Sequence, residues 1–187
     1  MPQFLISTMN SKFDPDRSRL NAAQCVVINQ VEECRLTDAE IWAASLRSKG
    51  GLAINVVERG LSRSRNKAIA AAKADICVIA DDDLMFDGDA DARIEALFAE
   101  NPNVDVITFQ ARDGGGRPLK RYRKSGHAHS LLTAFNIISF EIAFRRTSVI
   151  NSGVLFDERF GLGAKFVSGE ENIFVADLVR AGLNVRY

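Results

Sequence analysis

The sequence predicts an α/β fold in which helices cover both faces of a mostly parallel sheet. Three runs of strand length, Gln3–Met9, Cys25–Ile28 and Ile76–Ala80, precede or alternate with helical patterns. Short apolar runs of this kind are typical of strands covered on both sides. Strands that alternate with helices form parallel sheets through right-handed crossovers. With 187 residues and no internal repeat, the chain is expected to form one domain, 1–187.

The other elements are predicted from capping, turn and periodicity signals. A capping-box pattern at Thr37–Glu40 opens a helix that Gly50–Gly51 closes. Ser62 or Ser64 can cap the next helix, which contains the alanine-rich run Ala68–Ala74. We expect a loop over Ser11–Ala22, and further strands over Leu52–Val57, Val104–Phe109, Ile137–Phe144 and from Asn184. Further helices are expected from Asp87 or Asp89 to Glu100 and over Glu170–Ala181, and a short helix or turn over Arg145–Ser152.

Composition and missing motifs narrow the class of protein. The chain has 24 basic and 24 acidic residues, so no net field favours nucleic acid or an anionic membrane. It has no apolar run as long as the ~18 residues of a membrane span and no signal-peptide pattern. Its three cysteines lack metal-site spacing and suit a reducing compartment. We expect a soluble cytoplasmic protein, without a P-loop, a dinucleotide fingerprint or a hydrolase elbow.

Three adjacent carboxylates, Asp81, Asp82 and Asp83, follow the strand Ile76–Ala80. Open α/β sheets bind ligands beyond the carboxyl ends of their strands. Adjacent acids repel one another, and hard cations such as Mg²⁺ and Mn²⁺ prefer carboxylate oxygens. In extended chain, Asp81 and Asp83 point to one side and Asp82 to the other. The motif therefore indicates a metal site, with a solvated acidic turn as the alternative.

One basic side chain is expected to point inward. Arg65, Ala68, Ile69 and Ala72 recur at helical spacing, so Arg65 lies in line with the apolar face of its helix. A cation at the N–H-rich start of a helix can meet a phosphate. A second group of basic residues lies in a predicted polar loop. It comprises Lys120, Arg121, Arg123 and Lys124 around Tyr122. This group is either a solvated surface or a binding surface for an anionic acceptor.

Two acids, Glu170 and Glu171, open the last predicted helix. Glu171 shares a face with Phe174 and Leu178, whereas Glu170 shares one with Asp177. We therefore expect Glu171 to point inward, where a carboxylate at a sheet edge is a candidate general base. The alternative is that both acids only stabilise the helix start, where free N–H groups favour negative charge.

Several segments match one family in the same order. Gly60–Asn66 and Asp81–Asp83 resemble the G-x-S-x-A-R-N…D-x-D core of family 2 glycosyltransferases, which have the Rossmann-like GT-A fold. Phe156–Gly161 and Gly169–Glu171 resemble the family's F-D-E-x-F…G-E-D segment. Ser7–Asn10 resembles the P-T-Y-N that ends its first strand. Three ordered matches over nearly the whole chain are more specific than any one of them.

The resemblance implies transfer of a sugar from a nucleotide-diphosphate donor to an acceptor hydroxyl, with inversion and with Mn²⁺ or Mg²⁺. A UDP-sugar is the expected donor. The acceptor would be a saccharide or lipid-linked, in surface polysaccharide or glycolipid synthesis, in the cytoplasm or at the inner face of the membrane. By resemblance, the donor contacts are Ser7, Thr8, Asn29, Arg65, Asp81 and Asp82, the metal contacts are Asp83 and Asp81, and the catalytic acids are Glu171 and Glu170.

The sequence departs from the family pattern in three places. Val27–Gln30 stands where the family has D-D-G-S, whose first acid holds uracil. The Asn29 amide can still donate to and accept from a base, but the basis for uridine recognition is missing. Glu171 replaces an aspartate, and the family commonly continues beyond the position of Tyr187. A non-catalytic nucleotide-sugar-binding domain is therefore one alternative. A sugar-nucleotide nucleotidyltransferase is another, but it needs a glycine-rich loop after the first strand and Ser7–Asp16 has no glycine. The sequence does not indicate an oligomeric state.

Overall fold

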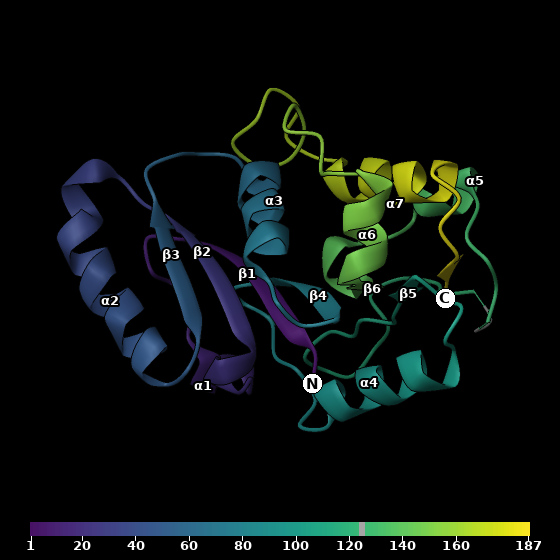
Figure 1. Cartoon of the computed structure of the whole chain (residues 1–187), viewed down its shortest axis with the longest axis horizontal. Coiled ribbons are helices and arrows are strands. Elements are labelled where there is room, and N and C mark those ends of the chain that lie inside the picture. The colour runs from purple at the N-terminus through teal and green to yellow at the C-terminus, as the bar shows by residue number, and fades with distance from the viewer. Residues whose placement is uncertain (124–125) are drawn as a thin grey trace.

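One mixed sheet forms the centre of the molecule in the computed structural model, which describes residues 1–123 and 126–187 (Figure 1). Within these residues the strand order is β3-β2-β1-β4-β6-β5-β7. The strands are β1 (Gln3–Met9), β2 (Cys25–Gln30), β3 (Leu52–Val56), β4 (Ile76–Asp81), β5 (Val106–Thr108), β6 (Ile142–Arg145) and β7 (Val185–Arg186). All neighbours pair in parallel except β6, which runs antiparallel to β4 and β5. The expected mostly parallel sheet is confirmed.

Helices cover both faces of this sheet, as expected. Figure 1 shows α3, α6 and α7 on the opposite side of the sheet from α4. Successive strand residues point to opposite faces, so Leu5 packs with α3, α6 and α7, whereas Phe4 and Ile6 pack with α2 and α4. The helices are α1 (Pro15–Ser18), α2 (Leu36–Ser48), α3 (Leu61–Ala71), α4 (Ala90–Glu100), α5 (Leu131–Ala134), α6 (Arg146–Ser152) and α7 (Glu170–Arg180).

Some predicted boundaries are wrong. The capping box at Thr37–Glu40 does not form, because a 3₁₀ turn over Glu33–Arg35 leads directly into α2. Neither serine caps α3; its N-cap is Gly60, whose φ of 127° requires glycine. The strand expected over Ile137–Phe144 starts only at Ile142, directly after a 3₁₀ turn over Ser139–Glu141.

The topology brings several chain segments to one edge of the sheet. Because β3, β2, β1 and β4 are parallel, their carboxyl ends meet at the same edge. The N-terminus of α3 and the loop 153–169, which leads into α7, lie at this edge too (Figure 1). Among the described residues, no helix has the length and apolar character needed to cross a bilayer.

Candidate active site at the carboxyl edge of the sheet

Arg65 on α3 joins two distant acids at this edge. Its Nη1 donates to Glu170 Oε1 at 2.8 Å and its Nη2 donates to Asp81 Oδ1 at 3.2 Å. The whole residue is 1% exposed, and its guanidinium carbon lies 5.4 Å from the centre of the Phe156 ring. A buried guanidinium is stabilised by such charge-assisted hydrogen bonds. Arg65 therefore fixes the end of β4 against the start of α7.

The inward direction of Arg65 follows from the periodicity of α3. Ala68 and Ile69 on the same face are also buried, as predicted. The next residue, Asn66, holds the backbone of Phe156 from both sides: its Nδ2 donates to the Phe156 carbonyl at 3.0 Å, and its Oδ1 accepts from the Phe156 N–H at 2.9 Å. Sequence reasoning missed this role of Asn66, although its place directly after Arg65 in the R-N pair was a signal.

The three aspartates differ in their surroundings. Asp82 Oδ2 accepts a 2.5 Å hydrogen bond from the Thr8 hydroxyl on β1, and Asp81 pairs across the sheet with Ser7. The Ser7 hydroxyl is buried and has no hydrogen-bond partner among the described residues. Asp83 is exposed, and in that same part of the chain its carboxylate makes no hydrogen bond or salt bridge. Ser7 and Thr8 thus lie next to Asp81 and Asp82, and the exposed carboxylate of Asp83 is accessible to a ligand.

Burial raises the pKa of two carboxyl groups at this edge. For Asp81 the rise is opposed mainly by the Arg65 charge. For Glu171 burial also raises the pKa, and the nearby negative charge of Glu170 adds to the rise. Glu171 Oε2 is buried without a hydrogen-bond partner among the described residues. A desolvated carboxylate of this kind has a raised proton affinity, which is the property that a general base requires.

The expected faces of the two glutamates need a correction. The expectation that Glu170 points outward is wrong, because the residue is only 5% exposed and is bound to Arg65. Glu171 is partly buried. Glu170 is thus neutralised by a cation, whereas Glu171 keeps a buried oxygen that has no hydrogen-bond partner among the described residues.

Asn29 has a different environment from the one predicted. The residue is fully buried; its Oδ1 accepts from the Ser11 N–H at 2.9 Å, and its Nδ2 donates to Ser11 Oγ at 3.0 Å and Asn55 Oδ1 at 2.8 Å. These bonds hold the turn after β1, where Asn10 and Ser11 have φ of 55° and 60°. Asn29 shapes this loop, and its amide is already satisfied by protein groups, which disfavours the expected direct contact with a base.

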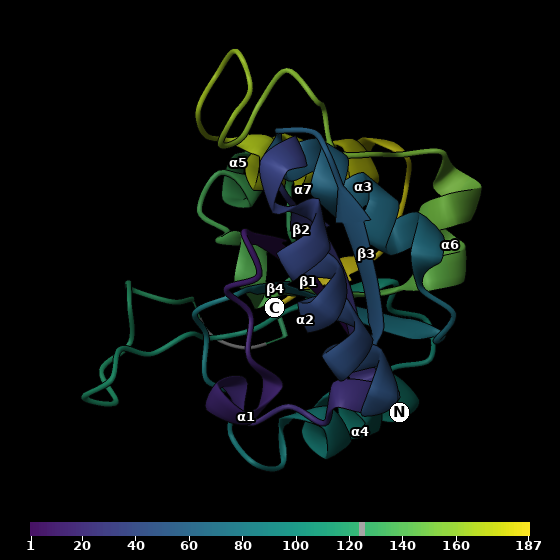
Figure 2. The same cartoon turned by 90° about the vertical axis from the view of Figure 1, so that its left-hand side faces the viewer.

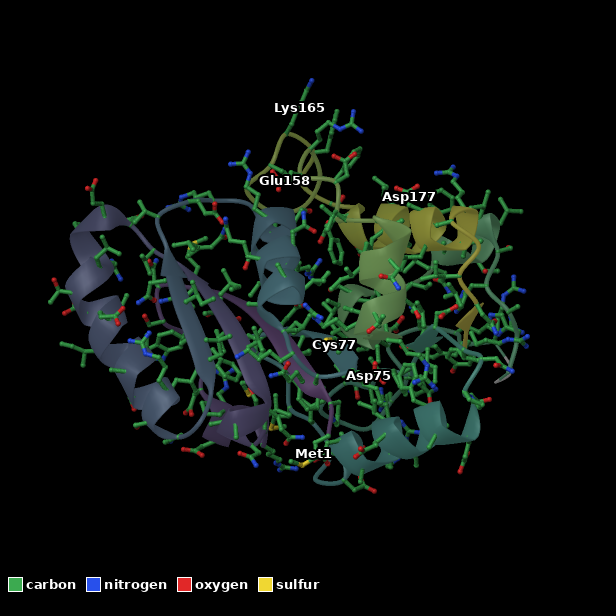
Figure 3. All side chains as sticks on the ribbon, in the orientation of Figure 1. Met1, Asp75, Cys77, Glu158, Lys165 and Asp177 are labelled. Carbon is green, nitrogen blue, oxygen red and sulfur yellow. The ribbon has the colours of Figure 1, made fainter. Side chains whose placement is uncertain are left out.

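The loop 153–169 packs on the start of α3 and positions Glu170. Ser62 Oγ donates to the Phe160 carbonyl at 2.7 Å, and Arg63 bonds to Glu158, which Figure 3 labels above α3, at 3.1 Å. Gly161 has a φ of 98°, and a Cβ on it would lie 3.2 Å from the Cδ of Glu170. The F-D-E-x-F-G segment therefore holds the two helix starts together, and Gly161 leaves room for the buried carboxylate.

The edge offers carboxylates for a cation without enclosing one. Among the described residues, no group of three or more His, Cys, Asp or Glu side chains is arranged to hold a metal ion. The two acids expected to contact a metal, Asp81 and Asp83, differ, since Asp81 contacts Arg65 and Asp83 faces water. Mg²⁺ commonly binds in such a setting, through one or two carboxylates, water and substrate phosphates. The donor set therefore fits a cation that arrives with a diphosphate.

The fold and this edge define the class of protein, a GT-A glycosyltransferase. The model of the family described as "Glycosyl transferase family 2" matches residues 51–159, which is more than half of the chain. The chain belongs to this family. The resemblance found in the sequence is thereby confirmed. A search of curated proteins found no match.

Solved structures agree with this fold. The crystal structure of S. aureus TarS 1-349 has a TM-score of 0.73 and 14% identity, covering 98% of this chain and 57% of that chain. Its complex with UDP-GlcNAc has a TM-score of 0.74 and 15% identity, and the match covers 99% of this chain and 55% of that chain. The mannosyltransferase PcManGT from Pyrobaculum calidifontis was solved in complex with GDP-Man and Mn²⁺. It has a TM-score of 0.61 and 17% identity, and the match covers 98% of this chain and 53% of that chain. The present chain thus spans little more than half the length of each.

Proposed function

We propose that this chain transfers a sugar from a nucleotide-diphosphate donor to an acceptor hydroxyl, with a divalent cation and with inversion at the anomeric carbon. Asp83 and Asp81 would contact the cation, Ser7, Thr8 and Asp82 the nucleoside side of the donor, and Glu171 would be the general base. Arg65 and Glu170 would position these groups, since both are already engaged with each other.

The buried Arg65 bridge is the observation that carries this proposal. Arg65 joins Asp81 on the donor side to Glu170, which is the neighbour of the candidate base. Arg65 and Glu170 are 105 positions apart in the sequence. A transferase must hold its donor and its base within reach of one reacting carbon, because most of its rate advantage comes from positioning. The bridge supports such an arrangement at a single sheet edge.

The donor side combines partly exposed acids with polar groups on β1. Asp83 and Asp81 would hold a cation there, which would supply stabilisation of the negative charge that develops on the leaving group. The Thr8 hydroxyl orients Asp82 through its hydrogen bond, and the Ser7 hydroxyl has no partner among the described residues and so can bond to a ligand. Structural neighbours were solved with UDP-GlcNAc, or with GDP-Man and Mn²⁺, which supports a nucleotide-sugar donor; the family resemblance favours a UDP-sugar.

The acceptor side depends on Glu171. Its pKa is raised by burial, which brings the carboxyl closer to the pH at which a general base works best. Its Oε2, which has no hydrogen-bond partner among the described residues, would accept the proton of the acceptor hydroxyl. The hydroxyl oxygen would attack the anomeric carbon as it loses this proton. The nucleoside diphosphate leaves from the opposite face, so one displacement inverts the configuration. A saccharide or lipid-linked acceptor in surface polysaccharide or glycolipid synthesis, on the cytoplasmic side, would fit this chemistry.

Calorimetric titration with UDP and GDP in the presence of Mn²⁺ tests the donor site. We expect the wild-type chain to bind at least one nucleotide, and Asp83→Ala to lose Mn²⁺-dependent binding. Asp87→Ala is the matched control, because Asp87 is another exposed acid a few residues further on, in a surface ion pair with Arg93. Absence of nucleotide binding in the wild type, or equal effects of the two substitutions, would contradict the proposal.

A domain that binds nucleotide sugar without turnover is the second candidate. The glutamate at position 171, where the family has aspartate, favours it, because the longer side chain changes the reach of the base. Release of nucleoside diphosphate from a nucleotide sugar, dependent on metal and lost in Glu171→Gln, would exclude this candidate. Tight binding without release would support it.

A further inference from the structure

A basic hairpin projects from the sheet beside the candidate site. We use this name for residues 111–123, whose two arms are joined through the N–H of Leu119 and the carbonyl of Ala111 at 3.1 Å and through the N–H of Asp113 and the carbonyl of Arg117 at 2.8 Å. Figure 2 shows the segment extending away from the body of the molecule. The turn at its tip is Asp113–Gly116, and Gly116 has a φ of 79°.

The charge of the hairpin contrasts with that of the whole chain. The 187 residues balance 24 basic against 24 acidic side chains, yet the hairpin has five basic residues and one acid. Arg117, Arg121 and Arg123 are exposed, and among the described residues none of them has a carboxylate within salt-bridge distance. Lys124, the last member of the basic group noted in the sequence, lies outside the described residues. The exposed arginines thus form a positive surface that the described acids do not neutralise.

A buried carboxylate fixes the direction in which these arginines point. Glu141 is 2% exposed and accepts hydrogen bonds of 2.5 Å from both Lys120 Nζ and the Tyr122 hydroxyl. Lys120 and Tyr122 therefore point toward the body. Side chains alternate along an extended segment, so the intervening Arg121 and the following Arg123 face solvent. A freely solvated basic loop would not need a buried anchor.

The root of the hairpin lies at the same sheet edge as the candidate site. The N–H of Phe109, the residue directly after β5, donates to the Glu141 carbonyl at 2.8 Å. Glu141 directly precedes β6, which pairs with β4 in antiparallel register, Val78 opposite Ala143. Because β4 ends at Asp81, the start of β6 and the end of β4 lie at one edge. The hairpin is thus two strands away from Asp81 along that edge.

We infer that the basic hairpin binds an acceptor chain that carries repeated anionic groups, phosphodiester or carboxylate, and so presents its hydroxyl to the site. This inference rests on the proposed transferase function. Arginine suits the role, because its planar fork matches both oxyanions. An anionic membrane is the less fitting partner: insertion needs an apolar face, and the exposed large hydrophobic side chain of the hairpin is Leu119.

The test measures binding of polyanions to the full chain by fluorescence anisotropy. The ligands are labelled inorganic polyphosphate, polygalacturonate and neutral dextran of similar length. The test variant replaces Arg117, Arg121 and Arg123 with glutamine and keeps Arg112, whose side chain bonds to the Gly116 carbonyl within the hairpin. The control variant replaces three exposed cations elsewhere, with no salt bridge among the described residues, by glutamine: Arg17, Arg35 and Lys73.

We expect one or both polyanions to bind more tightly than dextran, with an affinity that falls as salt rises. The test variant should bind roughly tenfold or more weakly, because it loses three exposed cationic contacts, and the control variant should bind as the wild type does. Comparison of the affinities for polyphosphate and polygalacturonate shows whether the hairpin favours phosphate or carboxylate groups. Equal losses in both variants, or no polyanion binding, would overturn the inference.

Two further measurements separate this inference from its alternatives. Vesicles of phosphatidylcholine with a minority of phosphatidylserine should not bind in a hairpin-dependent way; hairpin-dependent vesicle binding without polymer binding would overturn the inference in favour of a membrane contact. Nucleotide binding, measured with Mn²⁺ in the same samples, should be unchanged in the test variant. If the wild type binds no nucleotide but binds polyanions through the hairpin, the transferase proposal fails and the acceptor role fails with it, while the anion-binding surface stands.

Discussion

Replacing Arg65 with methionine is expected to destabilise the protein by about 3–5 kcal/mol, because it leaves a buried carboxylate without its cation. The side chains of Arg65 and Glu170 are 2% and 7% exposed, so water screens neither charge. The Asp81 side chain is 35% exposed, and solvent screening limits its share to about 1 kcal/mol. Most of the loss therefore comes from Glu170, and it is a large part of the ~5–15 kcal/mol of a typical domain.

Urea unfolding followed by circular dichroism measures this loss, with Arg63→Met as the matched control. Arg63 lies on the same helix and pairs with Glu158, but both side chains are about half exposed, 51% and 50%. Its replacement should cost less than about 1 kcal/mol. The double variant Arg65→Met/Glu170→Gln should recover part of the loss, since it removes the uncompensated charge. Equal losses for Arg65→Met and Arg63→Met would refute the reasoning.

Three further substitutions test the surroundings of this bridge. Asn29→Ala should lower the free energy of unfolding in urea by about 1–3 kcal/mol, because it leaves buried partners at Ser11 unsatisfied; an unchanged midpoint would contradict this. Glu171→Gln should abolish transfer but keep donor affinity, as kinetics and calorimetry can show. The raised pKa of Glu171 means that the wild type loses stability as the pH rises through the folded-state pKa. The amide of Gln does not titrate, so Glu171→Gln should be more stable than the wild type at neutral pH. If the free energy of unfolding of the variant depends on pH as that of the wild type does, this prediction is wrong. Gly161→Ala should cost about 1–3 kcal/mol in thermal unfolding, since its φ of 98° and the nearby Glu170 Cδ leave no unstrained place for a Cβ; wild-type stability would contradict this.

Much of the fold could be predicted because it depends on local patterns. The runs that form β1, β2 and β4 have the length and apolar character of covered strands, and the helices between them require parallel pairing. Periodicity alone gave the inward direction of Arg65, which is 1% exposed. The position of the aspartates followed from the end of the β4 run.

The burial of Glu170 could not be predicted, because its cause is not local. Its neighbours on the helix surface include Asp177, which suggested a solvated face, but its partner Arg65 lies 105 positions earlier in the chain. A charge becomes tolerable in the interior only when such a partner is present. Helical periodicity therefore ranked Glu170 and Glu171 in the wrong order of burial.

Asn29 and Glu141 show two other limits of sequence reasoning. The family pattern at the end of the second strand suggested a ligand contact for Asn29, yet its amide holds the turn at Ser11. Glu141 was missed, although a lone acid in the apolar run Ile137–Phe144 signals burial with a partner. Its hydrogen bond to the Ile138 N–H forms part of the 3₁₀ turn that delays the start of β6.

A crystal of the wild-type chain soaked with nucleotide sugars and Mn²⁺ tests the central idea most directly. The account predicts an ordered diphosphate with Mn²⁺ at Asp83, and the anomeric carbon facing Glu171. A donor bound at a different surface, with Asp83 and Glu171 both in contact only with water, would contradict it.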